Sequence, residues 1–229
     1  MDGYLQNVKN PGVSLVLSLP LLVAYELGLL LVGWNALNGA DFFTQALIGE
    51  LGKGGFALFN LGIIAVFVGA AAWLRRSGAF QPQYFFPLLI ESGIYAVSMG
   101  SIILFIMEEA HLLGGAGLQE YGFLTKLVLS AGAGLHEELV FRLGLIPLLT
   151  WVWARVPSIG GDVTALPFAL VASSVLFSLA HFAVEAFEWF PFWYRTFAGL
   201  FFGLLFWTRG FAVACYTHFL YDVYVLFLN

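Results

Sequence analysis

Three hydrophobic segments in the second half of the chain carry ionisable side chains of the types that hydrolytic enzymes use. They are Glu137, Glu138 and Arg142 in the first segment, His181 in the second, and His218 and Asp222 in the third. Glutamate and histidine are common general bases and acids in catalysis. Hydrolysis of a peptide bond needs an activated water, a proton donor for the leaving amine and stabilisation of the tetrahedral oxygen. Side chains of these types could supply all three.

The spacing within the first segment suggests different roles for its two glutamates. Glu138 and Arg142 are four residues apart, so on a helix they share a face and can pair, which lowers the cost of burying either charge. Glu137 is rotated by about 100° from its neighbour and is expected to face a different partner. We therefore expect Glu137 to be the base. His218 and Asp222 are also four residues apart and should share a face.

The same residue types also fit a zinc site. Glu137, His181 and His218 could be ligands with a fourth position open for water, and Glu138 would then be the base. The sequence lacks the His-Glu-x-x-His helix pattern of zinc peptidases at these positions, which favours a mechanism without a metal or another cofactor. Zinc stays as the alternative.

The composition indicates a membrane protein. Of the 229 residues, 61% are hydrophobic and only 10% are charged. Soluble domains are roughly half apolar and a quarter charged. No basic run suggests binding to a nucleic acid, so the expected surroundings are the lipid bilayer and no nucleic acid is expected as a partner.

Seven apolar segments are predicted to span the bilayer, because a spanning helix needs roughly 20 apolar residues. They are 12–34, 55–74, 86–107, 123–153, 163–186, 190–208 and 211–228. The fourth is too long for one crossing, so it could be tilted, extended into solvent, or broken near Ala131 to Gly134, and an eighth helix is possible. The expected fold is an all-α, polytopic transmembrane helix bundle, with one domain over 1–229 and a motif-bearing core at about 123–228.

The loop charges predict an orientation. Lysine and arginine alternate with acidic residues from one loop to the next, and the positive-inside rule then places the N-terminus in the cytoplasm and the C-terminus outside the cell membrane. All seven tryptophans fall at ends of the predicted spans, where indole rings settle between lipid and water. His181 would then lie toward the outer half of the bilayer, so the site is expected to open outward.

Three further charges within the predicted spans have ordinary explanations. Glu26 is expected to form an interhelical hydrogen bond. Glu91 lies near the start of its span and can reach the interface, and Arg195 is one turn into its span and can extend its charge to the interface.

Two other histidines and the single cysteine are also expected to be structural. His111 and His136 have no partner at an informative spacing, and a lone histidine is more often a satisfied polar group. Cys215 is expected to be a small packing residue, because no feature of its segment would activate a thiol.

The ordered motifs resemble the signature of the CPBP family, the CAAX proteases and bacteriocin-processing enzymes, also called the Abi family. The matching residues are Glu137-Glu138-x-x-x-Arg142, Phe177-x-x-x-His181 and His218-x-x-x-Asp222. The resemblance implies an all-helical intramembrane endopeptidase. Glu137 would activate water together with His181. The oxyanion would be stabilised by His218 and Asp222. Glu138 and Arg142, with Phe177 in the second motif, would support the site.

One position departs from part of the family. The last motif residue can be asparagine in the eukaryotic-type CAAX enzymes, and here it is Asp222. An ionised aspartate would repel an oxyanion, so Asp222 would have to be protonated, or it would orient His218 instead.

The resemblance leaves the substrate open. The family covers prenylated CAAX proteins, bacteriocin leaders and C-terminal sorting signals, the last removed by the bacterial myxosortases. A site that opens outward favours the trimming of envelope proteins. We therefore expect a membrane-anchored or lipidated protein, cut near its C-terminus, to be the substrate.

Two rival classes use similar residues. A proton-coupled transporter also needs intramembrane glutamate and histidine, but transporters are often built from repeated halves and no repeat is evident here. In a non-catalytic scaffold or immunity protein, the motif residues would only hold the bundle together.

Overall fold

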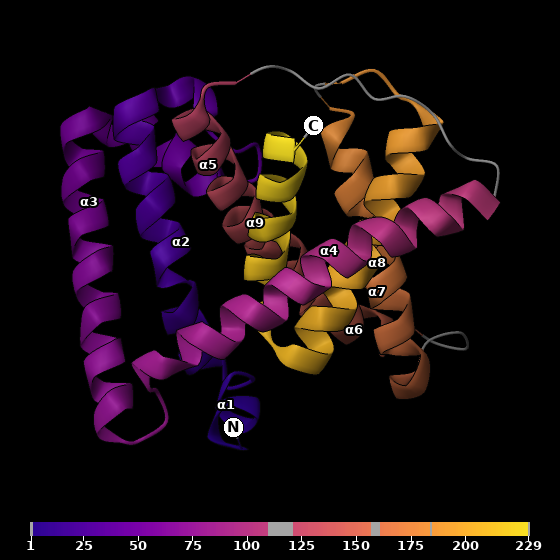
Figure 1. Ribbon diagram of the computed structural model, residues 1–229, viewed down its shortest axis with the longest axis horizontal. Coiled ribbons are helices and arrows are strands. Elements are labelled where there is room, and N and C mark those ends of the chain that lie inside the picture. The colour runs from indigo at the N-terminus through magenta and orange to yellow at the C-terminus, as the bar shows by residue number, and fades with distance from the viewer. Residues whose placement is uncertain (1, 110–120, 157–160, 184, 229) are drawn as a thin grey trace.

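The computed structural model describes residues 2–109, 121–156, 161–183 and 185–228, and no strand occurs in these ranges. The α-helices are α1 (Asp2–Asn7), α2 (Pro11–Val32), α3 (Phe42–Arg76), α4 (Phe85–Glu109), α5 (Phe123–Gly132), α6 (Ile146–Trp153), α7 (Asp162–His181), α8 (Trp189–Arg209) and α9 (Phe211–Leu228). The predicted all-α bundle is confirmed. In Figure 1, α2 and α3 form one side, α7 and α8 the other, and α9 lies between them in contact with α2, α4, α5 and α8.

Four helical segments of the described chain are long and apolar enough to cross a membrane: Pro11–Val32, Gly54–Arg76, Pro82–Glu109 and Asp162–His181. Large apolar side chains on these helices face outward, and Leu31, Val66 and Phe86 are 74%, 72% and 74% exposed. Such surfaces are unfavourable in water but suit hydrocarbon. The chain is therefore an integral membrane protein. The other predicted spans are helical but do not meet the same measure of length and hydropathy.

The fourth predicted span, 123–153, is one continuous helix whose middle turns are π-helical. It does not break at 131–134. Its hydrogen bonding changes from α to π over Ala133–Glu137 and again over Leu139–Leu145, and α6 continues the helix to Trp153. Its two ends have different neighbours, because α5 packs on α2 and α9 whereas α6 packs on α7. Single π turns inside α-helices are frequent at functional sites.

The fifth predicted span ends earlier than expected. The prediction was 163–186, but α7 ends at His181. The amides of Phe182 and Ala183 turn back to the carbonyls of Leu179 and Ala180, which closes the last turn. His181 is therefore the last residue of its helix rather than an interior one.

The π-helical turn packs closely against α9. A methyl group at Gly134 would lie 2.8 Å from the carbonyl oxygen of Cys215 and 2.8 Å from the backbone nitrogen of Phe219. Small residues at such positions let two membrane helices approach each other. Cys215 is fully buried at this contact, which confirms its predicted packing role.

We expect Gly134→Ala to destabilise the protein. The added methyl group meets backbone atoms that cannot rotate away, and overpacking of this kind typically costs about 1–3 kcal/mol. Unfolding of the purified protein in mixed detergent micelles measures the effect. Gly62→Ala is the matched control because nothing lies within 4 Å of a methyl group there. Equal stability of the two variants would contradict the close packing.

Candidate active site

Glu138 and Arg142 form a fully buried ion pair, as their spacing predicts. The guanidinium Nη1 lies 3.1 Å from Oε1 of Glu138, and the two side chains are 1% and 0% exposed. Arg142 also donates from Nη2 to the carbonyl oxygen of Gly199 at 3.2 Å. Its guanidinium lies 4.4 Å from the ring centre of Phe177. The pair therefore joins the π-helical segment to α7 and α8 behind the site.

Glu138 also fixes the orientation of His218. Its Oε1 lies 2.8 Å from Nδ1 of the imidazole. An ionised carboxylate only accepts hydrogen bonds, so Nδ1 carries the hydrogen and Nε2 is directed to the other side. The ring stacks on Phe202 with 4.4 Å between ring centres and 16° between planes.

Two histidine nitrogens converge on one oxygen of Glu137. Oε2 lies 3.8 Å from Nε2 of His218 and 4.0 Å from Nε2 of His181. Nδ1 of His181 donates to the carbonyl oxygen of Phe177 at 2.9 Å, so its Nε2 also points inward. These separations are too long for direct hydrogen bonds but match groups bridged by a water.

The π-helical turns bring both glutamates to the same imidazole. The expected rotation of about 100° would direct Glu137 to a different neighbour. Instead, Glu138 contacts Nδ1 of His218 and Glu137 faces Nε2, while Glu137 also reaches His181. The expectation of separate partners is thus only partly met.

Asp222 faces the same nitrogen as Glu137. Its Oδ2 lies 3.7 Å from Nε2 of His218. The carboxylate that holds Nδ1 is that of Glu138. Asp222 therefore lies on the side of His218 that faces the pocket.

These groups line one pocket of about 570 Å³. Its polar lining includes Glu137, His181, His218, Arg195 and Asp222, and the rest is largely aromatic or apolar. Arg195 is paired with Glu185 at 2.8 Å and is part of the pocket wall. Glu138 is not part of the lining.

The sequence prediction missed Asn38, which lies between α2 and α3. Its Nδ2 donates to Oε1 of Glu137 at 2.8 Å. Its Oδ1 accepts from the amide of Ala40 at 2.8 Å, and its own amide donates to the hydroxyl of Tyr25 at 2.9 Å. The side-chain amide is therefore held with its donor toward Glu137. No spacing rule could find this contact across 99 residues.

Glu26 and Glu91, two further charges within the predicted spans, each contact a side chain from another helix. Glu26 accepts a hydrogen bond from Nδ2 of Asn60 at 3.2 Å, which confirms the predicted bond between helices. Glu91 pairs with Arg209 and accepts from the hydroxyl of Tyr4 at 2.6 Å.

His136 contacts polar groups on both ring nitrogens, as expected of a structural histidine. Its Nδ1 lies 3.2 Å from the carbonyl oxygen of Gly132, and its Nε2 lies 3.6 Å from Oδ1 of Asp41, a residue that the sequence places in a loop. His136 and Asp41 approach each other only through the tertiary fold. His111 lies outside the described residues.

In the described chain, three side chains lie close enough to share a metal ion: Glu26, Asp41 and His136, whose ligand atoms all lie within 4.8 Å of one another. Glu137, His181 and His218, the ligands of the zinc alternative, do not belong to this group.

Comparison with known proteins agrees with the motif order. Residues 119–224 match the family model described as type II CAAX prenyl endopeptidase Rce1-like. The part of the chain that carries the motifs is thus similar to the Rce1-like family, which agrees with the predicted resemblance to the CAAX proteases. The Rce1-like segment contains all three motifs and begins after α4, so Asn38 and α1 to α4 lie outside it. No curated protein and no solved structure matches the chain.

The match to this family supports an intramembrane protease. The alternatives of a transporter or a scaffold find no support in this comparison.

Proposed function

We propose that this protein is a glutamate-dependent intramembrane endopeptidase that cuts a membrane-anchored or lipidated protein near its C-terminus. One observation carries the proposal. Nε2 of His181 and Nε2 of His218 both face Oε2 of Glu137, at 4.0 and 3.8 Å, in a pocket of about 570 Å³.

A water between these three groups is the nucleophile in the proposed mechanism. Glu137 removes a proton from it as the oxygen attacks the substrate carbonyl carbon, and His181 holds the water in position. The proton on Glu137 or His181 then passes to the leaving amine as the carbon–nitrogen bond breaks. Asn38 donates to the other oxygen of Glu137 at 2.8 Å, which keeps Oε2 directed at the water.

His218 and Asp222 are proposed to stabilise the tetrahedral oxygen. In this mechanism His218 carries a hydrogen on each ring nitrogen. The Nδ1 hydrogen is donated in a hydrogen bond to Glu138, and the Nε2 hydrogen points into the pocket. Asp222 lies 3.7 Å from that nitrogen. A protonated Asp222 could donate a second hydrogen bond, whereas an ionised one would repel the oxyanion.

The pocket wall supports an apolar substrate. Phe177, Phe190 and Phe202 line it, with Tyr194 and Tyr221 whose hydroxyls contact each other. The family description names prenyl endopeptidases, so a lipidated C-terminal segment is the substrate class that we propose. We further propose the cell membrane as the location, with a cytoplasmic N-terminus and a site that opens outward, on the basis of the loop charges.

The direct test compares C-terminal peptides in whole-cell proteomes. Cells with the wild-type protein are compared with cells that carry Glu137→Ala. We expect at least one membrane protein to keep a longer C-terminus in the variant cells. If no protein changes its terminus, the proposed activity is wrong for those cells.

Asn38→Ala is expected to slow cleavage by about 10-fold or more, because a hydrogen bond to a charged group contributes about 1.5–3 kcal/mol. The rate is measured on the substrate found in the proteome comparison. Gln83→Ala, which removes an exposed amide just before α4, is the control. As a positioning residue, Asn38 should also change the pH profile of the rate, whereas an effect on stability alone would leave that profile unmoved.

A further inference from the structure

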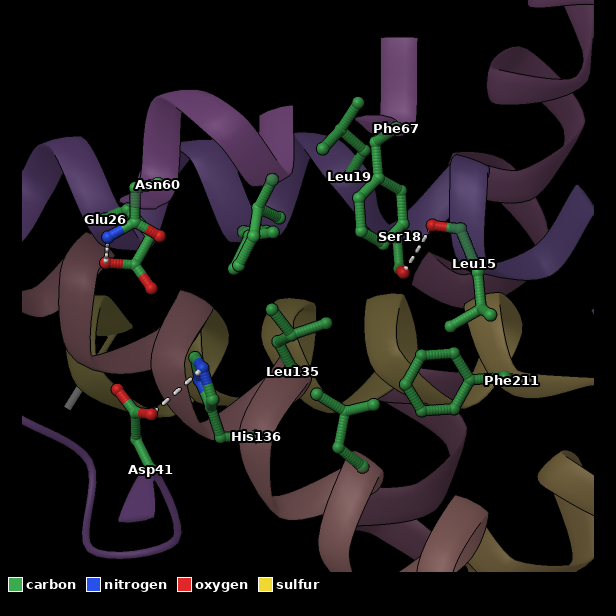
Figure 2. Close-up of a pocket in the computed structure, with 13 residues that line it drawn as sticks. Leu15, Ser18, Leu19, Glu26, Asp41, Asn60, Phe67, Leu135, His136 and Phe211 are labelled. Atoms are coloured by element: carbon green, nitrogen blue, oxygen red, sulfur yellow. Dashed lines mark hydrogen bonds and ion pairs between the residues drawn. The ribbon is translucent and has the colours of Figure 1, made fainter. Parts of the chain in front are cut away.

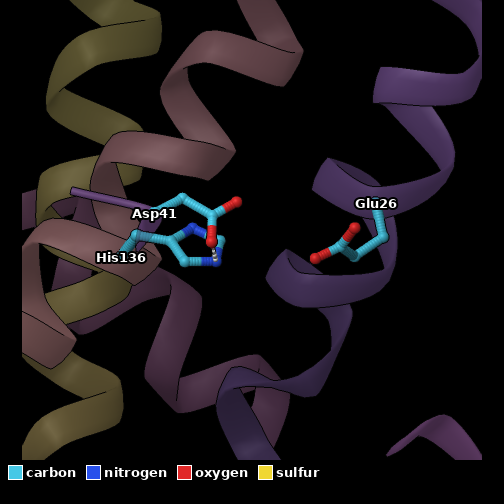
Figure 3. Close-up of side chains that lie close together, drawn as sticks. All are labelled: Glu26, Asp41 and His136. Carbon is cyan, nitrogen blue, oxygen red and sulfur yellow. Dashed lines mark ion pairs between the residues drawn. The ribbon is translucent and has the colours of Figure 1, made fainter. Parts of the chain in front are cut away.

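A second cavity, of about 230 Å³, lies between α2, α3 and the π-helical turn (Figure 2). Most of its lining is apolar, with leucines from α2 and Phe67 from α3. Glu26, Asp41 and His136 line it as well. They come from three separate parts of the chain and are 5%, 1% and 8% exposed. Figure 3 shows the three side chains directed toward one another.

The tautomer of His136 is fixed by the backbone. Nδ1 lies 3.2 Å from the carbonyl oxygen of Gly132, which can only accept a hydrogen bond. Nδ1 therefore carries the hydrogen, and Nε2 of the neutral ring presents a lone pair. That lone pair faces Oδ1 of Asp41, which is also an acceptor. A cation between them is one arrangement that satisfies both acceptors; a bridging water or a second proton on the ring are the others.

The distance between these atoms suits a shared metal ion. Nε2 of His136 and Oδ1 of Asp41 are 3.6 Å apart, longer than the usual 2.7–3.2 Å of such hydrogen bonds. Two ligands of one tetrahedral zinc ion, each about 2.0–2.1 Å from the metal, are roughly 3.3 Å apart. A movement of a few tenths of an ångström would bring the pair to that separation.

The candidate ligands also have the outer partners that metal sites require. A ligating histidine usually donates its other nitrogen to a backbone carbonyl or carboxylate, and ligating carboxylates are hydrogen-bonded in turn. The carbonyl oxygen of Gly132 is this partner for Nδ1 of His136. The hydroxyl of Tyr25 donates to Oδ2 of Asp41 at 3.1 Å, and Asn60 donates to Oε2 of Glu26 at 3.2 Å.

We infer that Glu26, Asp41 and His136 bind one divalent transition-metal ion, and we take zinc, which binds both histidine nitrogen and carboxylate oxygen, as that ion. The cavity provides room for a water as the remaining ligand. The ion fastens the segment before α3 to α2 and the π-helical turn. That segment also holds Asn38 against Glu137, so the ion supports the site without contacting the substrate.

Metal content of the purified, full-length protein in detergent tests the inference. The protein is stripped with a chelator, given an equimolar amount of zinc and desalted, and the bound metal is measured by mass spectrometry. Wild type is expected to retain one zinc ion per chain. Asp41→Asn and Glu26→Gln should each weaken binding by about 100-fold or more, because each removes a ligand charge. His181→Ala should bind zinc as wild type does.

Cobalt gives an independent readout, since a four-coordinate cobalt site with nitrogen and oxygen ligands absorbs visible light. Cobalt-loaded wild type should show these bands and cobalt-loaded Asp41→Asn should not. Circular dichroism and gel filtration verify that the variants are folded. Wild type that binds no zinc overturns the inference and leaves an imidazolium–carboxylate pair. Zinc that is lost in His181→Ala but kept in Asp41→Asn also overturns it, and supports the zinc alternative at the active site.

Discussion

Glu137→Gln is expected to lower the cleavage rate by about 10²–10⁴-fold, the usual contribution of a general base. The glutamine oxygen can still accept the hydrogen bond that Asn38 now gives at 2.8 Å, so the side chain keeps its position. Its amide cannot take a proton from water. The rate is measured on the substrate identified by the proteome comparison, and helical content is measured in parallel.

Glu185→Gln is the matched control. It removes a carboxylate that is 47% exposed and that pairs with Arg195 in the pocket wall. It should change the rate much less. The Glu137 variant also separates the rival classes. A scaffold would keep its function in Glu137→Gln, and a transporter would lose proton-coupled flux without any peptide product. Full cleavage by Glu137→Gln would refute the proposed base.

The second large effect is expected on stability. Arg142→Met should lower the free energy of unfolding by about 3–5 kcal/mol, because removal of one partner leaves a buried charge uncompensated. Glu138 is fully buried, and its Oε2 has no hydrogen-bond partner among the described residues. Its Oε1 contacts Arg142 at 3.1 Å and Nδ1 of His218 at 2.8 Å, so the substitution removes one of these two contacts. The loss also removes the guanidinium from the face of Phe177. Unfolding in mixed detergent micelles measures the change.

The double variant Glu138→Gln with Arg142→Met tests the cause. If the buried charge is responsible, the double variant will be more stable than Arg142→Met alone, since replacement of a whole buried pair is often nearly neutral. Arg76→Met, at the exposed end of α3, is the control for loss of an arginine. A double variant no more stable than the single one would mean that packing, and not charge, explains the loss.

Features that depend on local geometry could be predicted from the sequence. Low charge and long apolar segments indicate a membrane bundle because hydrocarbon requires satisfied backbone groups, which helices provide. The pairing of Glu138 with Arg142 follows from a spacing of four residues on one helix. The hydrogen bond of Glu26 to another helix was expected because a lone buried acid needs a donor.

Contacts between distant segments were decided by the tertiary structure alone. Asn38 meets Glu137 across 99 residues, and Asp41 meets His136 although the sequence places one in a loop and the other in a span. In a membrane helix nearly every face is apolar, so the pattern of residues says little about which face meets which neighbour.

The sequence by itself determined the class of protein, the order of the motifs and the residue types available for hydrolysis. The tertiary structure decided which atoms face one another. The π-helical turns let both Glu137 and Glu138 reach His218, and the early end of α7 sets His181 at the pocket. Helix widening and helix ends depend on how neighbouring helices pack, because their cost is balanced by contacts between segments far apart in the chain.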